Sequence, residues 1–115
     1  MDNETIPLNS SSSSPEEPLY ILSLLNNELK SSSWKLSNKE YKIGRSSENN
    51  IILDDITVSR NHALLSVSKG NIKITDNNST NGIYINNVIE SDSELKSGDK
   101  IQIGKYLLLL TEVMK

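Results

Sequence analysis

Short hydrophobic segments alternate with polar punctuation along most of this chain. In four of them apolar and polar residues alternate, namely Leu65-Ser66-Val67, Ile72-Lys73-Ile74, Ile83-Tyr84-Ile85 and Ile101-Gln102-Ile103. Successive side chains of a strand point to opposite faces, so this alternation predicts β-strands with one buried face. We find no stretch with the 3.6-residue period of a helix that is long enough to form one, and no internal repeat.

The pattern predicts a series of short strands. The expected strands cover residues 20–25, 33–36, 41–43, 51–53, 63–67, 72–75, 83–85, 100–103 and 106–113. Turn formers such as Lys69-Gly70-Asn71 and Asn86-Asn87 separate them, because Asn and Gly tolerate a positive φ. Many short strands at this spacing indicate an all-β sandwich or barrel.

The first 17 residues differ in composition from the rest of the chain. They contain a run of five serines, two prolines and no Lys or Arg. Their charged residues are Asp2, Glu4, Glu16 and Glu17. With few apolar groups to offset the entropy of ordering, residues 1–17 are expected to be a disordered acidic tail, and residues 18–115 a single domain. Since the formal charge of the whole chain is −3, that domain is close to neutral.

Composition excludes several classes of function. The chain has no Cys and one His, which argues against disulfides and metal sites, and no cofactor is expected. A net charge of −3 argues against general nucleic-acid binding. No apolar run is long enough to span a membrane, and the N-terminus is acidic where a signal peptide would be basic, so we expect a cytoplasmic protein.

Three loops carry polar residues that a turn alone does not need. They are Gly44-Arg45-Ser46-Ser47, the connection 54–62 with Ser59, Arg60 and the only His, and Asn77-Asn78-Ser79-Thr80-Asn81-Gly82. Each has a plain structural alternative: a solvated Arg at a strand end, a His that locks its loop by hydrogen bonds, and a Gly that allows a hairpin turn. A nucleophile triad at Ser59 and His62 is disfavoured, because no oxyanion-type glycine cluster lies beside them. The chain also lacks a glycine-rich phosphate cradle, so we expect no enzyme.

Taken together, the order and spacing of these anchors are specific. Gly44-Arg45, Ser59-Arg60-Asn61-His62 and Thr80-Asn81-Gly82, each between β segments, resemble the signature of the forkhead-associated (FHA) domain. The resemblance covers about residues 19–113 and includes Gly98-Asp99 and Ile101-Gln102-Ile103-Gly104. It implies a β-sandwich of about eleven strands in two sheets that binds phosphothreonine peptides through loops at one end.

The resemblance also implies roles for individual residues. Arg45 is the expected main phosphate ligand, because its planar fork of donors matches phosphate oxygens. Ser59, Arg60 and Thr80 are expected to add donors, and Asn81, with both a donor and an acceptor, to pair with the peptide backbone. The supporting residues are Gly44 and Gly82, which allow close approach and unusual φ, and His62, which holds the Ser59 loop.

Two segments, 51–63 and 98–105, are especially similar to small actinobacterial FHA regulators. That group binds and inhibits 2-oxoglutarate dehydrogenase and glutamate-metabolising enzymes. In it, a Ser/Thr kinase phosphorylates a tail threonine, which then occupies the protein's own FHA site. Here the tail is shorter and offers only Thr5 in place of adjacent threonines, so Thr5 is the candidate phosphorylation site.

Geometry permits such a tail contact. The 14 residues from Thr5 to Leu19 extend to about 45–50 Å, comparable to the width of a small domain. Two readings remain open: a regulator of metabolic enzymes, controlled by its tail or not, and an adaptor that docks another phosphorylated protein. In both we expect a monomer that binds neither nucleic acid nor membrane.

Overall fold

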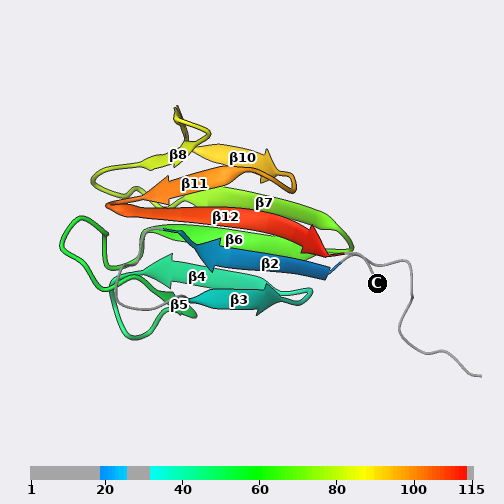
Figure 1. The fold of residues 1–115 in the computed structure, drawn as a ribbon. Helices are drawn as coiled ribbons and strands as arrows, with labels where there is room; N and C mark the ends of the chain where they lie inside the picture. Colours follow the sequence, from blue (N-terminus) through cyan, green and yellow to red (C-terminus); the bar gives the residue numbers. More distant parts are fainter. Residues whose placement is uncertain (1–18, 26–31, 114–115) are drawn as a thin grey trace, which may run out of the picture.

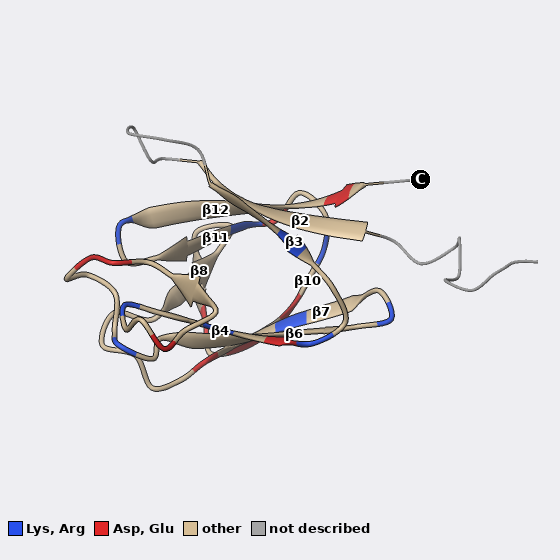
Figure 2. Ribbon diagram, turned by 90° about the horizontal axis from the view of Figure 1, so that it is seen from below, with Lys and Arg blue, Asp and Glu red and all other residues tan. Residues whose placement is uncertain are grey.

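The strands of this protein pack as two β-sheets, one on the other. The structure is a computed structural model, and it describes residues 19–25 and 32–113. Figure 1 shows the strands in chain order, and Figure 2, turned by 90°, shows the sheets as separate layers. The strands are β2 (Leu19–Leu24), β3 (Ser33–Leu36), β4 (Glu40–Gly44), β5 (Ile51–Ile52), β6 (Ala63–Ser68), β7 (Asn71–Asp76), β8 (Ile83–Ile85), β9 (Val88–Glu90), β10 (Asp92–Leu95), β11 (Lys100–Ile103) and β12 (Tyr106–Val113).

The two sheets contain six and five strands. The six-stranded sheet has the order β3-β2-β12-β11-β8-β9, and the five-stranded sheet the order β10-β7-β6-β4-β5. All neighbours pair antiparallel except β4 and β5, where Ile43 lies opposite Ile51 in a parallel register. The prediction of an all-β fold of about eleven strands in two sheets is confirmed.

Alternation along the strands produces the core. In β6 and β11 every second side chain is buried, as the sequence pattern requires. The inward-facing residues of the two sheets meet in one hydrophobic cluster, whose fully buried members include Leu22, Ile51, Ile83, Ile103, Leu108 and Leu110. This core fixes the positions of the strand ends from which the loops leave.

The sequence pattern did not predict two of the strands, β9 and β10. The first two residues of β9, Val88 and Ile89, are exposed, and Leu95 is the only buried residue of β10. A strand with one buried position or none shows no alternation to detect. The expected turns are present: Lys69 and Gly70 have φ of 51° and 83°, and Asn86 and Asn87 have φ of 50° and 72°.

Two further expectations bear on the fold. The described part of the chain contains no helix long and apolar enough to cross a membrane. The predicted acidic tail, with Thr5, lies outside the described residues.

Candidate functional site

Three loops meet at one end of the sandwich, and the Ser59 loop lies between the other two. The backbone N–H of Arg45 donates to the carbonyl of Ser59 at 3.0 Å. From the other side, the backbone N–H of Thr80 donates to Ser59 Oγ at 3.0 Å, and Asn81 Nδ2 donates to the carbonyl of Thr57 at 2.9 Å. The structure therefore brings together four of the five residues predicted to contact a ligand.

Arg45 directly follows β4 and its side chain turns back onto the Ser59 loop. Its Nε donates to the carbonyl of Val58 at 3.0 Å, which fixes the direction of the guanidinium. Among the described residues, the ion pairs are Lys73–Asp92 and Lys105–Asp55, so the structure gives Arg45 no carboxylate partner. Its outer amino groups can therefore bind an external anion.

Arg60, the fifth predicted ligand-contacting residue, is held differently. Its side chain is exposed, and its carbonyl accepts hydrogen bonds from Ser46 N at 3.2 Å and from Asn49 Nδ2 at 2.7 Å. Arg60 is thus anchored through its backbone, and the residue is exposed to solvent.

Gly44 allows this close approach of backbones. A Cβ built on Gly44 would lie 2.2 Å from the carbonyl oxygen of Arg60, a distance that real Cβ atoms do not reach. Gly82 serves the other side of the site differently: its φ is +79°, a conformation that residues with side chains rarely adopt.

Asn49 is a supporting residue that the sequence did not indicate. The residue is 6% exposed, and its side-chain Nδ2 donates to the carbonyls of Ser46 at 2.9 Å and Arg60 at 2.7 Å. It closes the turn that follows Arg45 and ties it to the Ser59 loop. In the polar run Glu48-Asn49-Asn50 the sequence offers no signal for this role.

His62 is completely buried and links two loops. Its Nδ1 lies 3.0 Å from the backbone nitrogen of Ser59, and its Nε2 lies 2.8 Å from the carbonyl oxygen of Gly82. A backbone N–H can only donate, so Nδ1 carries no proton, and Nε2 donates its proton to Gly82. The geometry thus requires the neutral Nε2–H tautomer. Through these two hydrogen bonds His62 holds the Ser59 and Gly82 loops together.

The loop from Asp76 to Gly82 is closed by a relay of hydrogen bonds. The Ser79 hydroxyl donates to Asp76 Oδ1 and accepts the backbone N–H of Gly82 at 2.9 Å. Thr80 and Asn81, between these anchors, are exposed. The relay therefore presents both residues to solvent on a fixed backbone.

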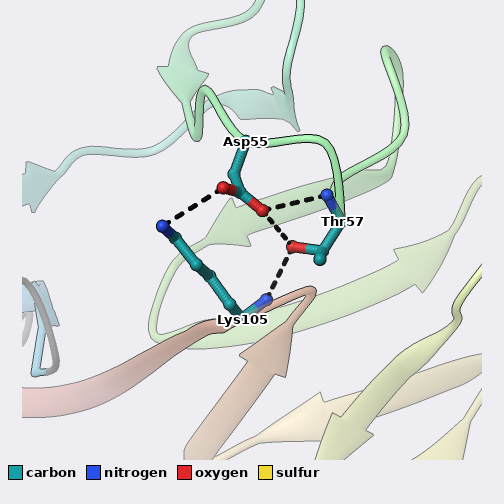
Figure 3. Close-up of polar contacts among 3 residues, drawn as sticks. All are labelled: Asp55, Thr57 and Lys105. Atoms are coloured by element: carbon teal, nitrogen blue, oxygen red, sulfur yellow. Dashed lines mark hydrogen bonds and ion pairs between the residues drawn. The ribbon is translucent and has the colours of Figure 1, made fainter.

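A second cluster is formed by Asp55, Thr57 and Lys105 (Figure 3), and the carbonyl of its Thr57 accepts a hydrogen bond from Asn81. Asp55 Oδ2 accepts hydrogen bonds from the Thr57 hydroxyl at 2.6 Å and from Thr57 N at 2.9 Å, and Asp55 Oδ1 lies 3.1 Å from Lys105 Nζ. Lys105 N donates to Thr57 Oγ1 at 2.9 Å. Thr57 thus holds its carbonyl, the acceptor for Asn81 Nδ2, in a fixed position.

These donors lower the pKa of Asp55 to about 2, from 3.8. The hydrogen bond from the Thr57 hydroxyl is the largest cause, followed by that from the Thr57 backbone and by Lys105. Asp55 is therefore a charged anchor over the whole neutral range. Within the described ranges, no group of three or more His, Asp or Glu residues could hold a metal ion.

Comparison with known proteins identifies the family. A family model for the FHA domain matches residues 41–104. The chain is 44% identical over 66 residues to the oxoglutarate dehydrogenase inhibitor of Corynebacterium efficiens, covering 57% of this chain and 46% of that protein. It is 41% identical over 66 residues to the glycogen accumulation regulator GarA of Mycolicibacterium smegmatis, covering 57% and 42%. The chain thus matches less than half the length of these relatives.

A solved structure gives the same result at the level of the fold. It is an FHA domain from an analysis of phosphothreonine-dependent FHA domain interactions, with a TM-score of 0.75 and 27% identity. The similarity covers 81% of this chain and 95% of that domain. The related proteins are named as inhibitors and regulators, and the domain is a binding module rather than a catalyst. On these grounds, and with the matched region spanning more than half of the sequence, this chain belongs to the FHA domain family.

Proposed function

We propose that the loop end of the sandwich binds an extended peptide that contains phosphothreonine. One observation carries the proposal: the Arg45 guanidinium is oriented by Val58, has no carboxylate partner among the described residues, and lies against the Ser59 loop. That loop is in turn hydrogen-bonded to Thr80 and Asn81. A phosphate dianion needs several convergent donors, and each charge-assisted hydrogen bond contributes about 1.5–3 kcal/mol.

The hydroxyl of Ser59 adds a donor at the centre of the cluster. Because its oxygen already accepts the N–H of Thr80, its own proton is directed elsewhere, and an anion beside Arg45 is a suitable acceptor. The Thr80 hydroxyl and the Arg60 guanidinium, both exposed, add donors at the rim. These groups together supply the charge and geometry that a phosphate requires.

Asn81 would hold the peptide backbone rather than the phosphate. One Nδ2 proton is given to Thr57, which leaves the second proton and Oδ1 for a ligand. A peptide carbonyl and a peptide N–H can pair with these two atoms. This contact selects an extended backbone, while Arg45 selects the phosphate.

We further propose that the protein regulates metabolic enzymes. The relatives named as oxoglutarate dehydrogenase inhibitors support 2-oxoglutarate dehydrogenase as a partner. The resemblance to small actinobacterial FHA regulators adds glutamate-metabolising enzymes as further partners and a Ser/Thr protein kinase as the controlling enzyme. In this scheme, phosphorylated Thr5 binds the protein's own site. The alternative is an adaptor that docks a phosphorylated partner without control by its tail.

Calorimetric titration with a phosphothreonine peptide tests the binding site. We expect Arg45→Ala and Asn81→Ala each to weaken binding at least about tenfold, since each removes a direct contact worth about 1.4 kcal/mol or more. Lys35→Ala and Asn71→Ala, which remove an exposed basic residue on β3 and an exposed asparagine on β7, serve as controls and should bind as the unmodified protein does. Unchanged affinity in both site variants would refute the proposal.

A pulldown before and after phosphatase treatment separates the two roles. A metabolic enzyme retained without phosphate supports the regulator. A partner whose capture depends on phosphate supports the adaptor.

A further inference from the structure

Asn81 is followed by Gly82, and this is the only Asn-Gly pair in the sequence. In such a pair the side-chain amide can be lost without any enzyme. The backbone nitrogen of the glycine gives up its proton and attacks Cγ of the asparagine, ammonia leaves, and a cyclic succinimide forms. Water then opens the ring at one of its two carbonyls and yields aspartate or isoaspartate. Glycine favours the attack because it has no Cβ to hinder it.

The fold opposes each requirement of this reaction. The attacking atom, Gly82 N, donates its proton to Ser79 Oγ at 2.9 Å, and a hydrogen bond to the protonated form disfavours the loss of that proton. The negative charge of Asp76, which is bonded to the same hydroxyl, disfavours an amide anion further. At the other reacting group, Asn81 Nδ2 is held by the Thr57 carbonyl at 2.9 Å, so Cγ is not free to turn toward Gly82 N.

We propose that Asn81–Gly82 is a spontaneous deamidation site that the Asp76–Ser79–Gly82 relay keeps closed. The reaction then proceeds only when the relay opens, so the opening of this loop sets its rate. The next most reactive pair in the loop is Asn78-Ser79, where a serine side chain hinders the attack. It provides an internal reference in the same peptide.

The consequence for binding rests on the proposed function. Deamidation replaces the Nδ2 donor of Asn81 by a carboxylate oxygen, which can neither donate to a peptide carbonyl nor tolerate a nearby phosphate dianion without repulsion. The isoaspartate product also lengthens the backbone within a loop whose conformation the relay defines. Either product removes the proposed peptide contact irreversibly.

Peptide mapping by mass spectrometry tests the modification itself. The full-length protein and its Ser79→Ala variant are incubated at mildly alkaline pH, and deamidation is followed at Asn81. Asn78 serves as the reference only in proteins that keep Ser79, because the variant changes the residue that follows it. Loss of the Ser79 hydrogen bond should raise the rate at Asn81 about tenfold. Ser93→Ala is the matched control, because that hydroxyl bonds to the Glu94 carbonyl outside the loop, and its rate should equal that of the unmodified protein. Equal rates in Ser79→Ala and the unmodified protein would overturn the proposal.

The unmodified protein alone supplies a second test, should Ser79→Ala fail to fold. Deamidation at Asn81 should be at least about tenfold slower in native buffer than in denaturant, because a closed relay limits the reaction. A native rate equal to the denatured rate would overturn the proposal as well. The deamidated fraction is then titrated with the phosphothreonine peptide. If Asn81 deamidates as expected and binding is unaffected, the role assigned to Asn81 in binding fails, while the modification site stands.

Discussion

The groups that bind the Asp55 carboxylate come from its own loop and from a turn far along the chain. The Thr57 hydroxyl and backbone N–H both bond to Oδ2, and Lys105, from the turn between β11 and β12, lies beside Oδ1. All three stabilise the ionised carboxylate and therefore lower its pKa to about 2. The Asp55 side chain thus links Thr57, whose carbonyl accepts a hydrogen bond from Asn81, to a turn of the six-stranded sheet.

This shift predicts how stability depends on pH. The folded pKa lies below the unfolded value of 3.8, so the stabilisation by Asp55 is complete above that value and is lost as the pH falls toward about 2. We expect Asp55→Asn to be less stable than the unmodified protein at neutral pH, and the difference to shrink between pH 3.8 and about 2. Urea denaturation of both proteins across this range measures it. A difference that stays constant down to the lowest pH would contradict the assignment.

At this scale, the sequence indicated some residues of the site and not others. Arg45 and His62 were predicted because the order and spacing of the motifs that contain them resemble the FHA signature. Asn49 and Thr57 were not predicted, because the contacts that tie them to other loops reach partners 11 and 48 positions away, at Arg60 and Lys105. Spacing along the chain carries no information about such contacts, which form only when loops from different strands meet.

Among the elements, β4 is the one whose end decides the geometry of the site. Its last residue, Gly44, passes so close to Arg60 that there is no room for a side chain. Gly98, in the turn before β11, offers a contrast: it has φ of +97°, and an added Cβ would meet nothing within 4 Å.

The two glycines should therefore respond differently to substitution. Gly44→Ala must displace backbone and should cost about 3 kcal/mol or more in the free energy of unfolding, whereas Gly98→Ala adds only backbone strain of about 1 kcal/mol. Denaturation in urea measures both values. Phosphopeptide binding should fall for Gly44→Ala and persist for Gly98→Ala. A Gly44→Ala protein as stable as Gly98→Ala would show that the close approach does not constrain the loop.

Among the strands, those that bury alternate residues were predictable from the sequence, and those with at most one buried residue were not. β6 and β11 bury alternate residues, and their boundaries differ from the expected ones by one residue at most. β9 lies at a sheet edge with Val88 and Ile89 exposed, so its pairing with β8 rather than burial defines it as a strand. This pairing follows from the two-residue Asn86-Asn87 turn. The sequence predicted that turn but not the strand that follows it.

For the whole molecule, the proposed regulation predicts an intramolecular contact. Phosphorylation of Thr5 should direct the tail to the loop end, since a short tether gives an effective concentration on the order of millimolar. We expect NMR shifts around Arg45, Ser59 and Asn81 to change on phosphorylation, and added phosphopeptide to bind less well. Thr5→Ala treated with the same kinase is the control and should show neither effect.

Identical spectra around these three residues before and after phosphorylation would reject the intramolecular contact. In that case the binding site could still serve partners in trans, because its donors do not depend on the tail.

The buried imidazole has a practical consequence for anyone who wishes to redesign the recognition loops. His62 joins the Ser59 and Gly82 segments through atoms that accept on one side and donate on the other. A transplanted loop must therefore bring a carbonyl oxygen to the place where Gly82 now holds one, whatever side chains it displays. Libraries that randomise Thr80 and Asn81 while keeping that carbonyl should yield folded proteins, whereas exchanges of the whole loop should fail unless the imidazole is replaced along with it.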